Sequence, residues 1–189
     1  MTDYPYDGLP APSFPLPAPV PKDPAPTSVW RELGALGLKI AVAAVAGLLA
    51  IVFVFGLYYS TEPGMNPAVQ EGDLVVYYRQ NRRCRAGDLV LLRFEGQTQV
   101  RRVIAAAGDT VDITEKGLLI NGAIQQERKI YRKTERYADG IDFPLTIAEG
   151  ELFVLGDARE GVTDSRIYGP VRIKDTYGTV IAVLRRRNL

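Results

Sequence analysis

The amino-acid sequence predicts a mainly β domain, folded as a partly closed sheet or barrel, behind one N-terminal transmembrane helix. Twenty consecutive residues without a formal charge, Ile40 to Tyr59, indicate the helix. Short apolar runs beyond residue 60, separated by Gly-Asp and Asn-Gly turn signals, indicate the β domain. We therefore expect three segments, residues 1–27, 28–59 and 60–189.

Residues 1–27 are expected to form a disordered cytoplasmic tail. Nine of the 13 prolines lie between Pro5 and Pro26, and each proline removes a backbone N–H that a helix or sheet would use. The tail is expected to act as a spacer. The alternative is that it docks in an aromatic-lined groove of a cytoplasmic partner.

Residues 28–59 are expected to form a membrane-proximal and transmembrane helix whose span, about residues 40–59, matches the ~30 Å core of a lipid bilayer. A cleavable secretory signal is the alternative, but this run is longer than such a signal and follows a proline-rich leader. Basic residues precede the span and acidic residues follow it: Arg31 and Lys39, then Glu62, Glu71 and Asp73. This asymmetry predicts a single-pass protein of the cell membrane with a cytoplasmic N-terminus and an extracytoplasmic β domain.

The segment 60–189 reads as short strands separated by turns. The expected strands are Leu74 to Arg79, Leu89 to Phe94, Val100 to Ala105, Val111 to Thr114, Leu118 to Ile120, Leu152 to Leu155 and Tyr177 to Leu184. The stretch from Gln125 to Leu145 has no clear pattern and is expected to leave the main sheet.

Composition excludes several classes of function. The chain has no histidine, which removes imidazole metal ligands and every nucleophile pair that depends on a histidine base. A formal net charge of +1 gives no concentrated basic face for a phosphate backbone. We therefore expect no nucleic-acid partner, no metal and no cofactor.

Cys84 is the single cysteine, so no internal disulfide can form. Its neighbours Arg82, Arg83 and Arg85 predict a lowered pKa for the thiol. Without a histidine partner, we expect Cys84 to be an incidental surface or strand residue.

Four sequence boxes follow the apolar run in order. They are Glu-Pro-Gly-Met-Asn-Pro-Ala-Val at 62–69 with Gly-Asp at 72–73, Gly-Asp-Leu-Val at 87–90, Val-Arg-Arg-Val-Ile at 100–104 with Gly-Asp at 108–109, and Gly-Asp-Ala-Arg at 156–159 with Asp-Ser-Arg at 164–166 and Gly169. Their order resembles that of the type I signal peptidases, peptidase family S26. The resemblance covers residues 58–184 and implies the same β fold behind a membrane anchor.

In that family, a serine in the first box attacks the scissile carbonyl and a neutral lysine in the third box takes its proton. The resemblance places these roles at Gly64 and Arg101, where neither can be filled, because glycine has no hydroxyl and arginine stays protonated. The hydroxyl that orients the lysine corresponds to Val162. The serine that supports the oxyanion hole corresponds to Glu62, whose carboxylate would repel a forming oxyanion.

The remaining family positions are expected to bind peptide or to hold the fold together. The segment Pro63, Gly64 and Met65 is a candidate peptide-binding element, with a buried methionine as the alternative for Met65. Four residues of the last box are expected to form a salt-bridged or turn-capping structural cluster: Asp157, Asp164, Ser165 and Arg166.

These observations predict a non-catalytic, membrane-anchored protein similar to signal peptidase I. We expect it to bind extended segments of secreted or pilin precursors as an accessory of secretion or assembly, like the degenerate signal-peptidase-like proteins of Gram-positive pilus loci. The alternative is a divergent active signal peptidase that cleaves secreted preproteins with another nucleophile, such as Ser60 or Thr61.

Overall fold

A computed structural model describes residues 29–80, 83–127 and 130–185. The chain divides into two units, Met1–Ala43 and Ala44–Leu189. The predicted proline-rich tail, residues 1–27, lies outside the described residues.

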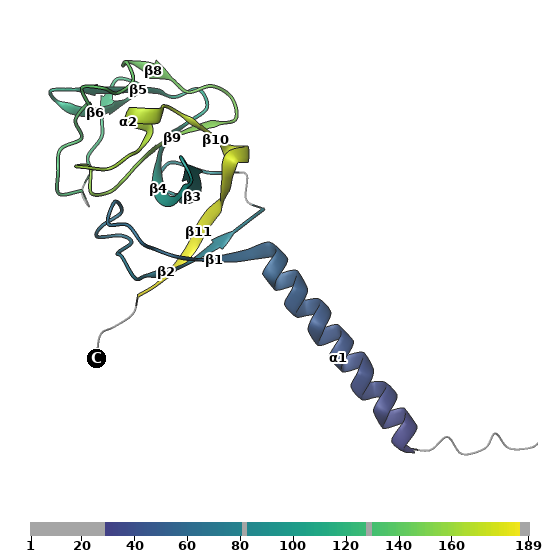
Figure 1. Ribbon diagram of the computed structural model, residues 1–189. Helices are drawn as coiled ribbons and strands as arrows, with labels where there is room; N and C mark the ends of the chain where they lie inside the picture. Colours follow the sequence, from purple (N-terminus) through teal and green to yellow (C-terminus); the bar gives the residue numbers. More distant parts are fainter. Residues whose placement is uncertain (1–28, 81–82, 128–129, 186–189) are drawn as a thin grey trace, which may run out of the picture. The chain divides into compact units, whose positions relative to one another are not determined.

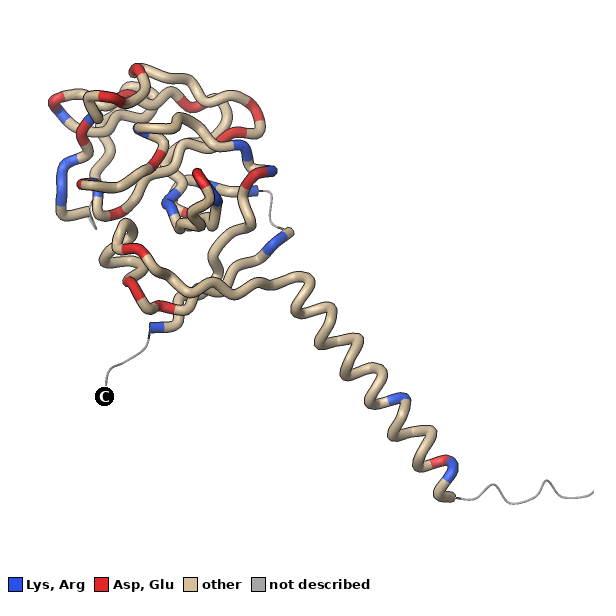
Figure 2. Tube along the Cα trace, viewed as in Figure 1, with Lys and Arg blue, Asp and Glu red and all other residues tan. Residues whose placement is uncertain are grey.

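One helix, α1 (Val29–Val54), is long and apolar enough to cross a membrane, and none of its residues is buried against the rest of the chain. Its charges, Arg31, Glu32 and Lys39, all lie in its first half, as the charge colouring shows (Figure 2). The helix is therefore a candidate membrane anchor, as predicted.

The helix ends earlier than the sequence predicts. Residues Phe55–Tyr59 form a strand, β1, which pairs antiparallel with β2 (Leu74–Tyr78). Gly56 lies opposite Tyr77, so closely that a Cβ at this position would overlap the tyrosine ring. The expected helix to residue 59 is wrong because an uncharged run does not distinguish an apolar helix from the apolar strand that follows it.

The β strands form two open sheets (Figure 1). The larger sheet has the order β1-β2-β11-β3-β4-β9-β10, and its further members are β11 (Thr176–Leu184), β3 (Leu89–Phe94), β4 (Gln97–Ala106), β9 (Glu151–Leu155) and β10 (Val171–Arg172). The smaller sheet has the order β7-β6-β5-β8, formed by β7 (Ala123–Ile124), β6 (Gly117–Ile120), β5 (Thr110–Thr114) and β8 (Leu145–Thr146). A short helix α2 (Ser165–Tyr168) and a single 3₁₀ turn η1 (Ile173–Asp175) complete the described elements.

Each of the predicted strands overlaps an observed one, which confirms the mainly β fold. The sheets do not close into a barrel. The stretch expected to leave the main sheet, Gln125 to Leu145, contributes no strand to the larger sheet among its described residues, and its last residue begins β8 of the smaller sheet.

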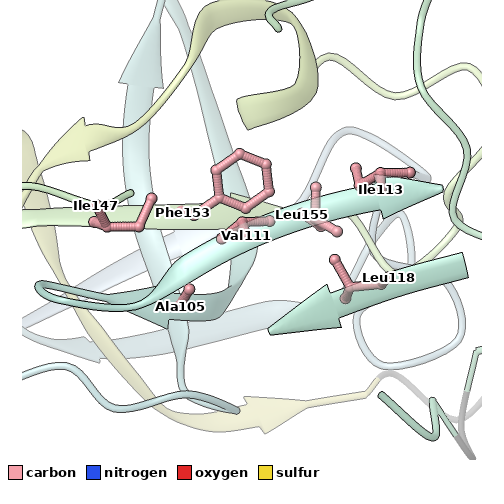
Figure 3. Close-up of a cluster of buried hydrophobic side chains, with 7 residues drawn as sticks. All are labelled: Ala105, Val111, Ile113, Leu118, Ile147, Phe153 and Leu155. Carbon is pink, nitrogen blue, oxygen red and sulfur yellow. The ribbon is translucent and has the colours of Figure 1, made fainter. Parts of the chain in front are cut away.

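An apolar cluster holds the smaller sheet against the larger one. Figure 3 shows its buried side chains, which come from β4, β5, β6, β9 and the residue after β8: Ala105, Val111, Ile113, Leu118, Ile147, Phe153 and Leu155. Alternation along β5 and β9 directs these side chains to one face. This packing fixes the positions of β4 and β9. Residues of β4 and of the loop that follows β9 form part of the site described below.

β4 lies between β3 and β9, but each of these strands pairs with only part of its length. Its residues Gln97 to Arg102 pair with β3, whereas its pairing with β9 begins at Arg102. Within the described residues, the stretch from Gln97 to Arg101 thus has a strand on one side only. It forms a local sheet edge in the interior of a larger sheet.

The strand assignment of Phe55–Tyr59 predicts that Gly56→Ala destabilises the domain by about 1–3 kcal/mol, since the added methyl group must displace the buried Tyr77 ring. Gly34→Ala, in the exposed helix, is the matched control, because nothing lies within 4 Å of the added Cβ. Urea unfolding of the full chain in detergent, followed by circular dichroism, measures both. Equal stability of the two variants would contradict the packed strand.

Candidate functional site

A cleft of about 500 Å³ lies between residues 62–66, the first half of β4 and the loop 158–163. The first, third and fourth boxes of the sequence come together here, whereas no residue of the second box, 87–90, lines the cleft. Glu62, Gly64, Arg101 and Val162, the four positions singled out by the resemblance, all line it.

Arg101 is the most unusual residue of the cleft wall, because its long charged side chain is only 1% exposed. All three guanidinium nitrogens donate hydrogen bonds. Nε and Nη2 donate to the Thr163 carbonyl at 3.1 and 2.9 Å, and Nη1 donates to the Val100 carbonyl at 2.6 Å. Nη2 also donates to the side-chain oxygen of Gln99. The guanidinium is thereby fixed in one orientation.

Glu62 supplies the opposite charge. Its two carboxylate oxygens accept from Nη1 and Nη2 of Arg101, in the two-pronged geometry that suits a guanidinium. The Glu62 side chain is 31% exposed, so one side of the pair faces the cleft and the other is buried. This ion pair joins the two residues that the resemblance aligned with the family's lysine and with its oxyanion-hole serine.

Gly64 and Val162 lie beside this ion pair, and the sizes of their side chains determine how much space remains there. A Cβ at Gly64 would lie 3.2 Å from Cγ1 of Val162 and 3.3 Å from Nη1 of Arg101, so the larger arginine and valine leave little room there. The Gly64 carbonyl accepts a hydrogen bond from the Ala158 amide at 3.1 Å. The backbone of the first box is thus joined to the loop on the opposite wall.

Met65 does not line the cleft. It is 1% exposed and packs in an apolar cluster with Val69, Val75 and Leu91. The expectation that it contributes to a peptide-binding element is therefore wrong, and the alternative, a buried methionine, is what the structure shows. Pro63 and Gly64 remain at the surface of the cleft.

The residues of the last box form hydrogen-bonded ion pairs behind the cleft. Asp164 is fully buried, caps α2 by accepting from the Arg166 amide, and pairs with the Arg166 guanidinium at 2.8 Å. Ser165 accepts from the Val154 amide through its hydroxyl at 3.0 Å. Asp157 pairs with Arg102 of β4 at 2.5 Å and not with Arg166.

Neither of the alternative nucleophiles named above, Ser60 and Thr61, lines this cleft, and the one hydroxyl side chain among its lining residues is that of Thr163. Ser60 is 2% exposed, and the Ser165 hydroxyl is engaged with the backbone, as described above. Among the described residues, the cleft lining contains no serine and no lysine, and no group of acidic or cysteine side chains could hold a metal ion.

Sequence reasoning missed two polar residues beside Arg101. Gln99 lies two residues before Arg101 in β4, on the same face of the strand, and this spacing could have revealed it. Tyr168 gave no such signal. Burial raises the pKa of the Tyr168 hydroxyl far above its usual range, with the Asp164 and Glu62 carboxylates adding to the shift and Arg101 opposing it.

The lowered thiol pKa expected for Cys84 is wrong, whereas nothing among the described residues contradicts the expectation that the residue is incidental. Burial raises the pKa of its thiol, and the nearby Asp88 carboxylate adds to this shift, whereas the Thr179 hydroxyl 3.6 Å away opposes it. Among the described residues, burial therefore outweighs any effect of nearby charge on the thiol. Cys84 packs at the margin of an apolar cluster with residues of β3 and β4, away from the cleft.

The chain is similar to known proteins over most of its length. Residues 33–184 match the family described as "Signal peptidase, peptidase S26". Signal peptidase I of Bacillus licheniformis is 32% identical over 138 residues, which are 67% of this chain and 74% of that protein. Signal peptidase I S of Bacillus subtilis is 30% identical over 140 residues, with the same coverage of 67% and 74%. The crystal structure of a signal peptidase I from Enterococcus faecalis matches with 27% identity and a TM-score of 0.44, covering 52% of this chain and 97% of that one.

The geometry of Arg101 predicts that Arg101→Lys destabilises the domain by about 2–4 kcal/mol, since one ammonium cannot replace the fork of donors and leaves buried acceptors unpaired. Arg172→Lys is the matched control, because Arg172 also pairs with a carboxylate, that of Asp175, but is 60% exposed. Its effect should stay within about 0.5 kcal/mol. Urea unfolding in detergent distinguishes the two, and a mild effect at both sites would show that the Glu62 pair contributes little.

Proposed function

Because the chain belongs to the signal peptidase family, peptidase S26, we propose that its cleft binds extended peptide segments without cleaving them. The main support for this proposal is the buried Arg101 guanidinium, which forms an ion pair with Glu62. The resemblance aligns Arg101 with the family's general base. A guanidinium keeps its proton at any pH a protein tolerates, so it cannot activate a nucleophile. Gly64 offers no hydroxyl to activate.

The electrostatics of the cleft also oppose peptide-bond cleavage. Attack on a carbonyl develops negative charge on its oxygen, and preorganised donors normally stabilise that charge. Here the Glu62 carboxylate occupies the position of one such donor. Its partner Arg101 cannot compensate, because its three nitrogens already donate to Glu62, Gln99 and the carbonyls of Val100 and Thr163.

The local sheet edge of β4 supports binding of an extended segment. Gln97, Gln99 and Arg101 alternate along this stretch and line the cleft, and the stretch pairs only with β3 within the described residues. Side chains already donate to two of its carbonyls, Tyr58 to that of Thr98 and Arg101 to that of Val100. An extended peptide that pairs with such an edge gains affinity from main-chain hydrogen bonds and selectivity from side-chain pockets. Binding in this mode requires no catalytic group.

The proposed clients are secreted or pilin precursors that emerge at the membrane surface. In this proposal α1 is an uncleaved anchor with a cytoplasmic N-terminus, since its basic residues precede the apolar span and acidic residues follow it. The chain then acts as an accessory of secretion or pilus assembly, and the tail before α1 serves as a spacer or as the contact for a cytoplasmic partner.

Photo-cross-linking tests the proposal. The full chain in detergent, with a photoreactive amino acid in place of Gln97 at the cleft, should cross-link to a secreted preprotein that keeps its full length. The matched control carries the same amino acid at Glu149, which is exposed and outside the cleft, and should not cross-link. A shortened product that disappears in Ser60→Ala or Thr61→Ala would instead establish the divergent active peptidase.

We expect peptidase activity to need two changes: a serine and a lysine must replace Gly64 and Arg101, and the Glu62 carboxylate must be removed. The triple variant Gly64→Ser, Arg101→Lys and Val162→Ser should stay inactive, since the Glu62 carboxylate would raise the pKa of the new lysine and keep it charged. Adding Glu62→Ser should produce detectable cleavage of a preprotein in detergent, because the catalytic groups act as a unit. Equal activity of the triple and quadruple variants would show that Glu62 does not control the site.

A further inference from the structure

We propose that the cleft selects segments that carry a positively charged side chain, and that Gln99 positions the peptide backbone beside that side chain. This inference rests on the proposed peptide binding and names its substrate class. It is carried by two independent observations, an unpartnered buried donor and the charge balance of the cleft lining.

The first observation is the side-chain amide of Gln99, which is 4% exposed and lines the cleft. Its oxygen accepts from Arg101. A guanidinium only donates, so this contact fixes which end of the amide faces Arg101 and turns Nε2 away from it. Nε2 then has no hydrogen-bond partner among the described residues. Nε2 is itself closed to solvent. A buried donor without an acceptor is unfavourable, and a ligand carbonyl oxygen satisfies it when the Gln99 side chain turns toward the cleft.

The second observation is an excess of negative charge around that donor. The lining carries Glu62, Glu95 and Glu160 but a single cation, Arg101. The Glu62 carboxylate neutralises Arg101, so the carboxylates of Glu95 and Glu160 remain. Glu95 forms no ion pair with any described residue.

Glu160 has a partner, but a weak one. Its carboxylate lies 3.6 Å from Arg132, and both side chains are about two-thirds exposed at 67% and 66%. An exposed pair of this kind is easily exchanged for another cation. A lysine or arginine of a bound segment can therefore compete with Arg132 for Glu160. An acidic side chain would meet the two carboxylates of the lining, and the one weakly held cation beside them, Arg132, does not line the cleft.

The cleft is large enough for such a segment. Its volume of about 500 Å³ falls within the range of sites that enclose several groups of a ligand. Gln99 offers a donor to a backbone carbonyl, which every peptide has, and the glutamates distinguish one side chain from another. General affinity and charge selectivity thus come from different residues of the cleft and can be separated by mutation.

Fluorescence anisotropy with labelled synthetic peptides tests the inference on the full chain in detergent. Three peptides of the same Ala-Ser repeat differ only in a central Lys, Gln or Glu. The Lys peptide should have a Kd about three- to tenfold lower than that of the Gln peptide, and the Glu peptide should bind most weakly. The advantage of the Lys peptide should disappear near 1 M NaCl, where the Debye length is about 3 Å.

Two variants assign the effect to the residues named. Glu95→Gln with Glu160→Gln, both at exposed positions, should abolish the preference for Lys and leave the Gln peptide unchanged. Gln99→Met should weaken the Lys and Gln peptides by the same factor, about fivefold, with circular dichroism as the check on folding. An unchanged Gln peptide in Gln99→Met would mean that water alone satisfies the donor.

The outcomes separate this inference from the proposed function. Equal binding of the three peptides would overturn charge selection while peptide binding stands. Absence of binding by every peptide would overturn both.

Discussion

The ion pair between Glu62 and Arg101 determines what the cleft can be. A buried guanidinium is tolerated only with a counter-charge and with acceptors for its remaining donors, and Glu62, Gln99, Val100 and Thr163 supply them. The pair in turn needs a small residue beside it, because a side chain at Gly64 would press on the guanidinium. The residues that the resemblance sets apart from the family pattern therefore form one physical unit, in which the small Gly64 makes room for the pair of Glu62 and Arg101.

The wall opposite β4 depends on two further buried arginines. Arg159 donates to the Gly156 carbonyl and to the side chains of Thr134 and Glu127. Arg166 lies 4.4 Å from the centre of the Tyr137 ring and donates to the Arg159 carbonyl at 2.6 Å. These contacts join the irregular stretch after β7 to the loop 158–163. The segment that appeared to be an unpatterned excursion thus supports one wall of the cleft.

The sequence predicts the strands well because the apolar runs are short and separated by turn residues, with Gly-Asp directly before β2, β3 and β5. It fails at the end of α1, where no charge separates the helix from β1, and only the opposing ring of Tyr77 reveals that Gly56 belongs to a sheet. Through the family resemblance, the sequence identifies four residues that prove to line the same cleft: Glu62, Gly64, Arg101 and Val162. It does not reveal that two of them form an ion pair, because a contact between residues 39 positions apart depends on tertiary packing.

In the proposed role, the ion pair also accounts for a cleft that binds a ligand without a catalytic base. A neutral lysine needs an apolar site without a nearby carboxylate, whereas a permanent cation requires that carboxylate. Once Arg101 and Glu62 neutralise each other, the other carboxylates of the lining dominate its field, and the Gln99 amide presents a donor beside them. In the proposed role, the substitutions that remove chemistry are thus the same ones that give the cleft its preference for a ligand.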